Sequence, residues 1–510
     1  MNEGNVMIGD QQGPAERVRA AVIGAGPGGI CMGIQLRAAG LDDFIILERS
    51  DGVGGTWRRH TYPGCACDVP SQVYQFSFEL NPAWSRPYAP QPEILAYMER
   101  CAEKYGLMPH CRFRSEVIAA TWDDARSTWT LELGDGSLIE ADAVVSAVGM
   151  FNQLVWPDIP GLADFQGRVF HSSHWDWDHD LSGKRVGVIG SAASSVQFIP
   201  EIVKQAAQVY LFQRTANWVL PKPDTLYTAE QLEVFRTSPA ALQAARDEVF
   251  ATQEMNNVAK AGAEARATRE ALVLAAIDVV QDPAVRAKLR PDHPWGCKRP
   301  LISNEYYPAF NRPNLELVTD PIAALDDRTI VTADGMGRRV DTLILATGYD
   351  TTKYTSVIDV TGSHGITLAE AWKDGAQAHL GISTAGFPNL FMLYGPNTNN
   401  GSIITMIEFQ VSHVVALLQR MAEGGLAWAE VRPERMAAYN AEVQQAIAGV
   451  THWQAGCNGY YRSPSGRVVT QWPATMGAYR DRVVVPDPDD YFFGTSMAIP
   501  ERAQAKPVES

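Results

Sequence analysis

The chain has 510 residues, 46% of them hydrophobic and 20% charged, which is enough for two or three domains with their own cores. Its formal net charge of −15 argues against nucleic acid or an anionic membrane surface as a partner. Seven cysteines in this length form no disulfide framework, and no apolar run is long enough to span a membrane, so the composition favours a cytoplasmic enzyme.

The N-terminal segment is polar, contains acids and lacks the apolar core of a signal peptide. We expect residues 1–17 and 496–510 to be flexible tails. Residues 18–48 then alternate between an apolar run, a helical spacing and a second apolar run. This order predicts a strand–helix–strand unit at the start of the folded chain.

The turn of this first unit reads GAGPGG and has the glycine spacing of a dinucleotide site. Gly24 permits a tight turn, Gly26 lets the backbone approach a pyrophosphate, and Gly29 lets helix and strand pack closely. The N-terminus of the helix offers unpaired N–H groups to the anion. Glu48 ends the second strand, where an acid can accept hydrogen bonds from a ribose. The unit therefore predicts a bound dinucleotide.

Residues 52–68, GVGGTWRRHTYPGCACD, indicate which nucleotide binds there. The glycines that end at Gly55 resemble the segment that wraps FAD in flavin monooxygenases. The longer pattern through Thr56 and Trp57 to Asp68 resembles a signature of Baeyer–Villiger monooxygenases. That family uses FAD and NADPH to insert one oxygen atom beside a ketone carbonyl. The resemblance implies that these four residues help to bind FAD at the first site.

Two cysteines in the same segment raise a different possibility, because flavin disulfide reductases carry a cysteine pair that accepts electrons from the flavin. Cys65 and Cys67 have the spacing C-x-C. This spacing is poor for a disulfide, which needs a suitable distance between its Cβ atoms. We therefore interpret these cysteines as incidental to the chemistry.

Two later apolar stretches, ADAVVSAVG and VDTLILATG, resemble each other and each end in a glycine. In flavoprotein oxidoreductases with two nucleotide domains, such strands lie where the chain passes from one domain to the other. The sequence thus predicts an α/β fold with two doubly wound, Rossmann-like domains and a helical insertion. The predicted order is an FAD-binding domain over 18–151, an NADPH-binding domain over 152–347 with a helical insertion at 224–295, and the second part of the FAD-binding domain over 348–495.

The resemblance is sharpest at residues 165–176, FQGRVFHSSHWD. The family fingerprint is F-x-G-x-x-x-H-x-x-x-W followed by Pro or Asp, and the related N- and S-oxidising enzymes usually lack its Trp-Asp ending. A single histidine in a link is more often a structural hydrogen-bonding group than a catalyst, and no second ligand cluster indicates a metal. The resemblance implies that the histidine and first tryptophan couple NADPH binding to domain movement. The matching residues are Phe165, Gly167, His171, Trp175 and Asp176.

A second strand–helix–strand unit starts at Lys184, but its turn, VGVIGSAASSVQ, lacks two of the usual glycines. Both replacements, Ala192 and Ser195, are small, and the helix N-terminus remains, so we predict a working NADPH site. Arg214 stands past the next strand, where it can pair with a 2′-phosphate. The candidate NADPH residues are Gly190, Ser191, Ala192, Ser194, Ser195, Arg214, Thr215 and, from the resemblance alone, Lys298.

Between the helical insertion and the next strand, the segment GCKRPLISNEYYPAFNRPN resembles a family segment with a Lys-Arg pair. The resemblance aligns Arg299 with the active-site arginine and Asp68 with the acid that contacts it. Attack on a ketone carbonyl creates negative charge on oxygen, and a buried arginine supplies a fixed positive charge there. A neighbouring acid fixes the orientation of the arginine and reduces the cost of burying it.

The resemblance extends over most of residues 18–480 and is weakest in the helical insertion, where we expect substrate preference to be shaped. It implies an enzyme in which NADPH reduces FAD, dioxygen forms a peroxyflavin, and a small-molecule ketone becomes an ester or lactone. One alternative is an N- or S-oxidising flavin monooxygenase of the same superfamily. A more distant alternative is an NADPH-dependent flavin disulfide reductase. The sequence leaves the identity of the ketone and the oligomeric state open.

Overall fold

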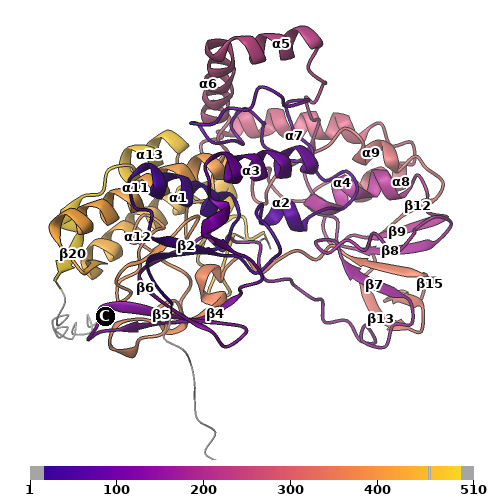
Figure 1. Ribbon diagram of the computed structural model, residues 1–510. Helices are drawn as coiled ribbons and strands as arrows, with labels where there is room; N and C mark the ends of the chain where they lie inside the picture. The colour runs from indigo at the N-terminus through magenta and orange to yellow at the C-terminus, as the bar shows by residue number, and fades with distance from the viewer. Residues whose placement is uncertain (1–15, 458, 460, 496–510) are drawn as a thin grey trace, which may run out of the picture.

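A computed structural model of the protein describes residues 16–457, 459 and 461–495. Two α/β bodies lie side by side, and a group of helices that includes α5, α6 and α7 lies above them (Figure 1). This arrangement confirms the predicted fold class. Most of both predicted tails lies outside the described residues. Glu16 and Arg17 are a correction, because they already belong to the first strand and not to a tail.

The first sheet has the strand order β17-β4-β5-β6-β1-β2-β3, with β18 paired to β6. Strands β3, β2, β1, β6 and β18 run parallel, as the first unit predicts, whereas β4 and β5 add an antiparallel extension that the sequence pattern did not predict. The strands are β1 (Glu16–Ile23), β2 (Phe44–Leu47), β3 (Cys111–Arg112), β4 (Val117–Asp123), β5 (Thr128–Leu133), β6 (Leu138–Ser146), β17 (Asp359–Thr361) and β18 (Leu390–Met392).

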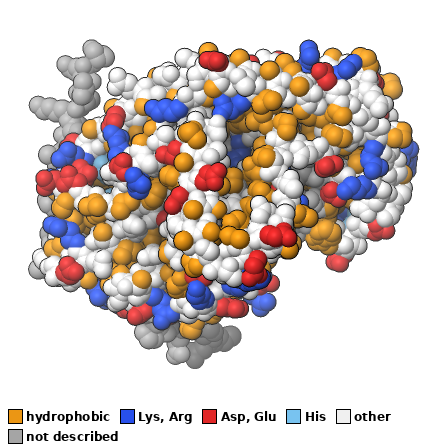
Figure 2. Space-filling view, turned by 90° about the horizontal axis from the view of Figure 1, so that it is seen from above, with side chains coloured by type: hydrophobic (Ala, Val, Ile, Leu, Met, Phe, Trp, Pro, Cys, Tyr) orange, Lys and Arg blue, Asp and Glu red, His pale blue; other side chains and the backbone are white. Residues whose placement is uncertain are grey.

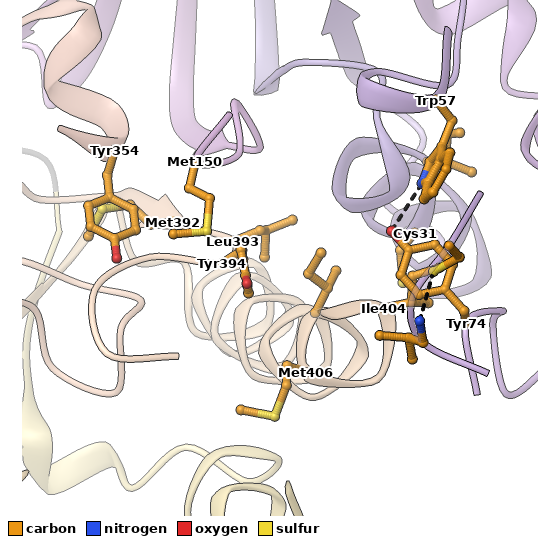
Figure 3. Packing of buried hydrophobic residues seen from close by; sticks show 14 of the residues in the cluster. Cys31, Trp57, Tyr74, Met150, Tyr354, Met392, Leu393, Tyr394, Ile404 and Met406 are labelled. Atoms are coloured by element: carbon orange, nitrogen blue, oxygen red, sulfur yellow. Dashed lines mark hydrogen bonds between the residues drawn. The ribbon is translucent and has the colours of Figure 1, made fainter. Parts of the chain in front are cut away.

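Helix α1 (Pro27–Ala38) is the central helix of this body and is largely apolar, so it is buried along most of its length. It packs against the 22-residue helix α11 (Ile403–Gly424). Figure 3 shows the buried side chains around them, with Cys31 of α1 and Ile404 of α11 close together. The other elements of this body are α2 (Thr56–Arg59), α3 (Gln91–Lys104), α10 (Leu368–Ala371), α12 (Pro433–Ala448), α13 (Met476–Val483), β19 (Trp428–Val431) and β20 (Tyr491–Gly494).

The second sheet has the order β12-β9-β8-β16-β7 and is parallel throughout. A small antiparallel sheet, β13-β14-β15, lies beside it. Sheet membership describes pairing and not independent folding, so the domain boundaries at residues 151 and 347 stay predictions. The elements are β7 (Arg168–His171), β8 (Arg185–Ile189), α4 (Ala193–Ile202), β9 (Gln208–Phe212), α9 (Tyr306–Ala309), β12 (Leu315–Val318), β13 (Ile322–Asp326), β14 (Thr329–Thr332), β15 (Gly337–Arg339) and β16 (Thr342–Leu345).

The chain passes between the two sheets twice, through a first linker (147–167) and a second linker (346–353). The two linkers lie side by side. The Val155 amide donates to the Gly348 carbonyl at 3.0 Å, and the Asp350 amide donates to the Gln153 carbonyl at 3.0 Å. Movement of one body relative to the other must therefore bend both linkers together.

The helical insertion consists of α5 (Ala229–Thr237), α6 (Pro239–Met255), α7 (Ala263–Ile277) and α8 (Pro283–Leu289), the last of which was not predicted. No residue of α5 is buried, and α6 buries only Leu242, so this pair has little apolar anchoring. Thr228 and Ser238 cap the two helices with their side chains. Short strands on either side of the insertion, β10 (Val219–Leu220) and β11 (Leu301–Ile302), pair with each other and bring its ends together.

One disulfide joins Cys297 to Cys457, with their Cα atoms 6.1 Å apart. The scattered cysteine pattern did not predict this bond, because its partners are 160 residues apart in sequence. The other five cysteines are free. Among the described residues, no helix is long and apolar enough to cross a membrane.

Candidate active site

The first glycine turn connects β1 to α1. Gly24 has a φ of 104°, and a Cβ atom there would lie 2.8 Å from the Ala147 carbonyl oxygen. A Cβ atom at Gly29 would overlap the carbonyl oxygen of Gly24, so helix and turn touch through backbone alone. Gly26 caps the helix without any side-chain hydrogen bond, which leaves the first N–H groups available to an anion. The turn thus fits the pyrophosphate of a dinucleotide.

Glu48 ties this turn to the end of β2. Its side chain is buried, and its two carboxylate oxygens accept from the Ala25 amide at 2.7 Å and the Ser50 amide at 2.8 Å. The segment that carries Gly55 packs on the same turn, since a Cβ atom at Gly55 would lie 2.8 Å from the Gly26 Cα atom. Residues far apart in sequence therefore meet around one site.

Thr56 and Trp57 start helix α2 directly after these glycines. Trp57 is buried, and its indole N–H donates to the Tyr74 hydroxyl at 3.0 Å (Figure 3). The Gln91 side-chain amide donates to the Trp57 carbonyl. These bonds fix the segment that leads to Asp68.

The second turn, which connects β8 to α4, accommodates Ala192 and Ser195 at the positions of the two missing glycines. Ala192 caps α4 with φ −93° and ψ −155°, close to the values of −75° and −171° at Gly26, and this extended backbone suits any residue. Ser195 is buried, and its hydroxyl donates to the Gly190 carbonyl at 2.5 Å. In the second unit, the Ser195 hydroxyl thus makes a hydrogen bond to the turn, whereas in the first unit Gly29 packs directly on the turn. No side chain caps α4, so its first N–H groups can also face an anion.

Two cations come together near the end of β9. Arg214 is exposed, and Lys298 is half-buried. Burial lowers the pKa of Lys298 below its ordinary value, and the nearby Arg214 lowers it further. Asp292 has a smaller, opposite effect on the pKa of Lys298, but among the described residues neither cation lies within ion-pair distance of an acid. Two unpaired cations in one place fit a phosphate group.

The remaining predicted NADPH residues surround the same helix start. The Ser191 hydroxyl donates to the Thr215 carbonyl at 3.5 Å, and Ser194 is half-buried in the first turn of α4. Asn217, which the sequence pattern did not indicate, donates from its side-chain amide to the Ser191 carbonyl at 2.9 Å. The segment that follows β9 therefore also helps to fix the second turn.

Arg299 and Asp68 lie against each other although they are 231 residues apart in sequence. The guanidinium donates to both carboxylate oxygens, from Nε at 3.1 Å and from Nη2 at 2.6 Å. Their side chains remain 34% and 24% exposed, so the pair can still be approached by a small molecule. This geometry gives a fixed positive charge of defined orientation. Seen from above, the molecule has a hollow near its centre in which Lys or Arg side chains lie (Figure 2).

The fingerprint segment lies between the two linkers. His171 is buried and its Nδ1 is 2.7 Å from the Ser173 hydroxyl. Burial, with a smaller effect of His174, lowers the pKa of His171 to about 4, so its ring is neutral at pH 7. The ring centroid is 6.1 Å from that of Trp156 in the first linker and 6.1 Å from that of Tyr349 in the second. His171 thus contacts both crossings of the chain.

The other fingerprint residues have packing and pairing roles. Phe165 belongs to the core of the second body, and a Cβ atom at Gly167 would lie 2.6 Å from the Asp341 carbonyl oxygen. Asp176 accepts from Arg168 Nε at 2.6 Å and Nη2 at 2.5 Å.

Trp175 and the loop that ends in Asp68 both contact helix α4. Phe198 of α4 packs between Trp175, at 5.3 Å between centroids, and Tyr62, at 6.0 Å. Gln197, one residue earlier, accepts from the Tyr62 hydroxyl at 2.9 Å and the Ala66 amide at 3.3 Å, and donates to the Ala66 carbonyl at 2.9 Å. No sequence pattern indicated this role, because a single glutamine has no characteristic spacing. Gln197 joins the second body to the loop that ends in Asp68.

Cys65 and Cys67 do not form a disulfide. Both thiols are buried, and burial raises their pKa values, that of Cys65 to about 12. Burial therefore disfavours the thiolate form of both cysteines, which is the nucleophilic form. In the part of the chain that the structure describes, no group of three or more His, Cys, Asp or Glu residues is placed to hold a metal ion.

Comparison with known proteins gives a consistent picture. The chain matches the pyridine nucleotide-disulphide oxidoreductase family over residues 21–275. It is 41% identical to a Baeyer–Villiger monooxygenase of Streptomyces coelicolor, over 91% of this chain and 90% of that protein. Cyclohexanone monooxygenase from Rhodococcus, solved with NADP⁺, superposes with a TM-score of 0.86 at 27% identity, over 94% of this chain and all of that one. A closed and an open crystal structure of cyclohexanone monooxygenase superpose with TM-scores of 0.84 and 0.80, each at 27% identity over 92% of this chain and 97% of that one.

Proposed function

The chain belongs to the family of Baeyer–Villiger monooxygenases, and we propose that Arg299 and Asp68 form the centre at which it oxidises ketones. It is a flavin-dependent monooxygenase that uses FAD, NADPH and O₂ to convert a ketone to an ester or lactone. Our assignment of the centre rests on the bidentate contact between the Arg299 guanidinium and the Asp68 carboxylate.

When bound, FAD supplies activated oxygen and NADPH supplies the hydride that reduces the flavin. The residues around the first turn fit FAD, because the uncapped start of α1 can face a pyrophosphate and Glu48 closes the end of β2. The uncapped start of α4 fits a second nucleotide, and we propose that Arg214 and Lys298 bind its 2′-phosphate.

Arg299 carries a charge that burial does not remove, so it can stabilise negative charge that develops on oxygen when the ketone carbonyl is attacked. Asp68 holds the guanidinium plane in place through both of its oxygens. We assign Asp68 the positioning role and Arg299 the contact with the reacting atoms.

A cavity of about 460 Å³ lies between the segment after Asp68 and the helical insertion. Its walls include Pro70 and Tyr88 from the first body and Phe235 and Val249 from α5 and α6. This volume is in the range of small-molecule sites. Apolar and aromatic side chains share the walls with polar ones. We propose that the cavity receives the ketone, which would let the insertion shape substrate preference.

The reaction is tested by product analysis. Purified holoenzyme with NADPH and a broad panel of cyclic, linear, aromatic and steroidal ketones is incubated under ¹⁸O₂. We expect one labelled oxygen atom in each ester or lactone. Products without label would contradict the proposal.

Replacing Arg214 by alanine should weaken NADPH selectively. Loss of a charged hydrogen bond to the 2′-phosphate costs roughly 1.5–3 kcal/mol, so we expect the KM for NADPH to rise by roughly 10- to 100-fold. The KM for NADH should change little because NADH has no such phosphate. Steady-state kinetics with both nucleotides measure this, and Arg126→Ala, at an exposed ion pair on the first sheet, is the control. An equal rise in the KM values for NADPH and NADH would show that Arg214 does not bind the 2′-phosphate.

Replacing Gln197 by leucine should uncouple the two bodies. The variant loses three hydrogen bonds to the loop before Asp68, and we expect kcat to fall by about tenfold while the KM for NADPH stays within about threefold. Gln197→Glu, which keeps an acceptor oxygen but loses the donor to the Ala66 carbonyl, should recover part of the rate. Gln205→Leu, at an exposed position in the same body, is the control. If both leucine variants behave alike, Gln197 has no positioning role.

A further inference from the structure

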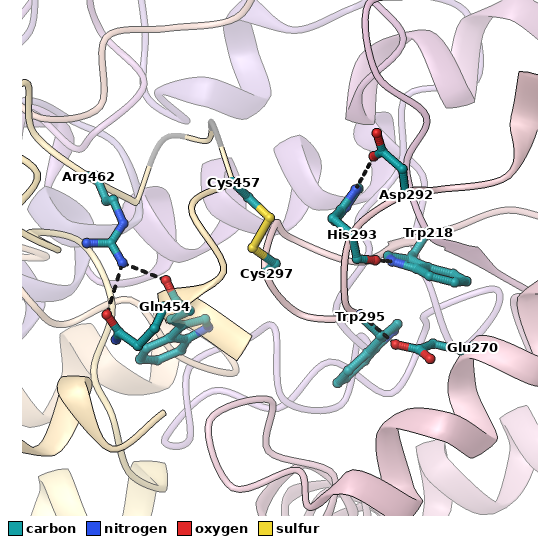
Figure 4. Close-up of a disulfide and its surroundings, with 10 residues drawn as sticks. Trp218, Glu270, Asp292, His293, Trp295, Cys297, Gln454, Cys457 and Arg462 are labelled. Carbon is teal, nitrogen blue, oxygen red and sulfur yellow. Dashed lines mark hydrogen bonds and ion pairs between the residues drawn. A yellow bond between two sulfur atoms is a disulfide. The ribbon is translucent and has the colours of Figure 1, made fainter. Parts of the chain in front are cut away.

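The disulfide between Cys297 and Cys457 connects two parts of the molecule that the backbone joins only through the linkers. Cys297 directly precedes Lys298 and Arg299, at the end of the helical insertion. Cys457 follows the short helix η4 (Thr451–Gln454) in the body that carries the first sheet. Figure 4 shows the bond between these two segments. The cross-link thus connects the proposed active-site segment to the opposite body.

Packing alone already brings the two segments together. A Cβ atom at Gly296 would lie 3.0 Å from the His452 ring and 3.0 Å from the Val258 side chain. A Cβ atom at Gly459 would lie 3.8 Å from the Lys298 Cγ atom. Because these contacts do not depend on the sulfur–sulfur bond, reduction would keep the segments adjacent but remove the covalent restraint. The segment that contains Cys457 would then be able to move away from Lys298 when the packing contacts open.

The two sulfur atoms differ in their surroundings. Cys297 is buried, at 4% exposure, whereas Cys457 is partly exposed. A thiolate from solution therefore reaches the Cys457 sulfur first. The leaving group is then the Cys297 thiolate.

We propose that Cys297 and Cys457 form a reversible thiol–disulfide site that controls the release of NADP⁺ beside Lys298. The reductant is a dithiol, and the oxidant is hydrogen peroxide. The inference rests on the proposed position of NADPH at Arg214 and Lys298.

The chemistry balances. One thiolate of the dithiol attacks the Cys457 sulfur, the disulfide breaks, and Cys297 leaves as a thiolate that takes up a proton. The second thiol of the reductant then attacks the mixed disulfide and releases Cys457. The protein gains two electrons and two protons, and the dithiol becomes a disulfide. In the reverse direction, the two thiols give two electrons and two protons to hydrogen peroxide, which yields two water molecules.

The restraint matters because a related cyclohexanone monooxygenase adopts open and closed forms. Product release or opening often limits the turnover of enzymes that close on their ligands. A cross-link between the two bodies opposes opening. We therefore expect the disulfide form to hold NADP⁺ longer and turn over more slowly than the dithiol form.

The first experiment asks whether the bond forms in the holoenzyme. Enzyme treated with hydrogen peroxide is unfolded without reductant, and its thiols are counted and its peptides mapped by mass spectrometry. We expect five titratable thiols and a cross-linked pair of peptides that contain Cys297 and Cys457, against seven thiols after dithiothreitol. A count of seven thiols after peroxide treatment would overturn the proposal.

The second experiment measures NADP⁺ affinity by calorimetry and kcat with and without dithiothreitol. For the native enzyme, we expect reduction to weaken NADP⁺ binding and to raise kcat, each by roughly threefold. Cys457→Ser should show the reduced values in both conditions. Cys111→Ser, which removes a free, half-buried cysteine, should respond like the native enzyme. Unchanged affinity and kcat on reduction of the native enzyme would show a structural cross-link only.

The outcomes separate this proposal from the assignment of function. Thiol mapping and NADP⁺ affinity do not depend on product formation. If the enzyme produces labelled ester but does not respond to dithiothreitol, only the redox site is wrong. If NADP⁺ affinity responds to reduction but no ketone yields ester, the redox site is supported and the assigned reaction is wrong.

Discussion

Replacing Arg299 by alanine is expected to stop ester formation while NADPH is still consumed. Removing a preorganised positive group from a site of developing negative charge costs roughly 10²- to 10³-fold in rate. The variant keeps the first turn, the second turn and the Arg214–Lys298 pair, so hydride transfer to the flavin should continue. The oxygen that is no longer transferred to ketone should appear as hydrogen peroxide. Parallel assays of NADPH oxidation, peroxide and ester measure this split.

Two further variants define the role of the pair. Arg299→Lys keeps the charge but cannot contact both Asp68 oxygens, so we expect an intermediate rate of ester formation. Asp68→Asn keeps the shape but lowers the attraction that orients the guanidinium, and its loss should be smaller than that of Arg299→Ala. Unaltered ester formation in Arg299→Ala would falsify the assigned centre, whatever happens to NADPH oxidation.

Replacing Gly29 by alanine should cost the enzyme its FAD. The added methyl group would overlap the Gly24 carbonyl oxygen, so either the turn or helix α1 must shift. Overpacking of this kind costs about 1–3 kcal/mol of stability. The shift would also displace the N–H groups at the start of α1 that fit the pyrophosphate. We expect flavin content after purification to fall by at least about tenfold. The ratio of absorbance at 450 nm to that at 280 nm measures it.

Ser195→Ala is the matched control, because Ser195 occupies the corresponding position of the second unit. There the helix already accommodates a side chain, and the variant loses only the hydrogen bond to the Gly190 carbonyl. We expect a cost of about 1 kcal/mol in stability and little change in flavin content. If Gly29→Ala retains its flavin as well as Ser195→Ala does, close packing at the first turn is not required for binding.

The parts of the fold that repeat a local pattern could be predicted from the sequence. Both strand–helix–strand units, the apolar stretches at the chain crossings and the helices of the insertion have periodicities that depend on nearby residues alone. The contact between Arg299 and Asp68 could be predicted only through the family resemblance, since nothing local relates positions 231 residues apart.

Other features depend on tertiary packing and had no sequence signal. The antiparallel strands β4 and β5 extend a parallel sheet, and strand propensity does not encode the direction of pairing. The Gln197 contacts and the Cys297–Cys457 bond arise where two bodies meet. Ser195 illustrates the converse, because the sequence shows that its side chain is small, while its bond to the Gly190 carbonyl required the structure.

The sparse burial of α5 and α6 has a consequence for engineering. A helix pair with one buried residue contributes little apolar burial to the fold, and β10 and β11 hold together the two ends of the whole insertion that contains this pair. Such a segment can be exchanged as a cassette for the corresponding helices of a relative without rebuilding the core. Libraries confined to this pair would vary the wall of the proposed ketone cavity while the nucleotide sites stay intact.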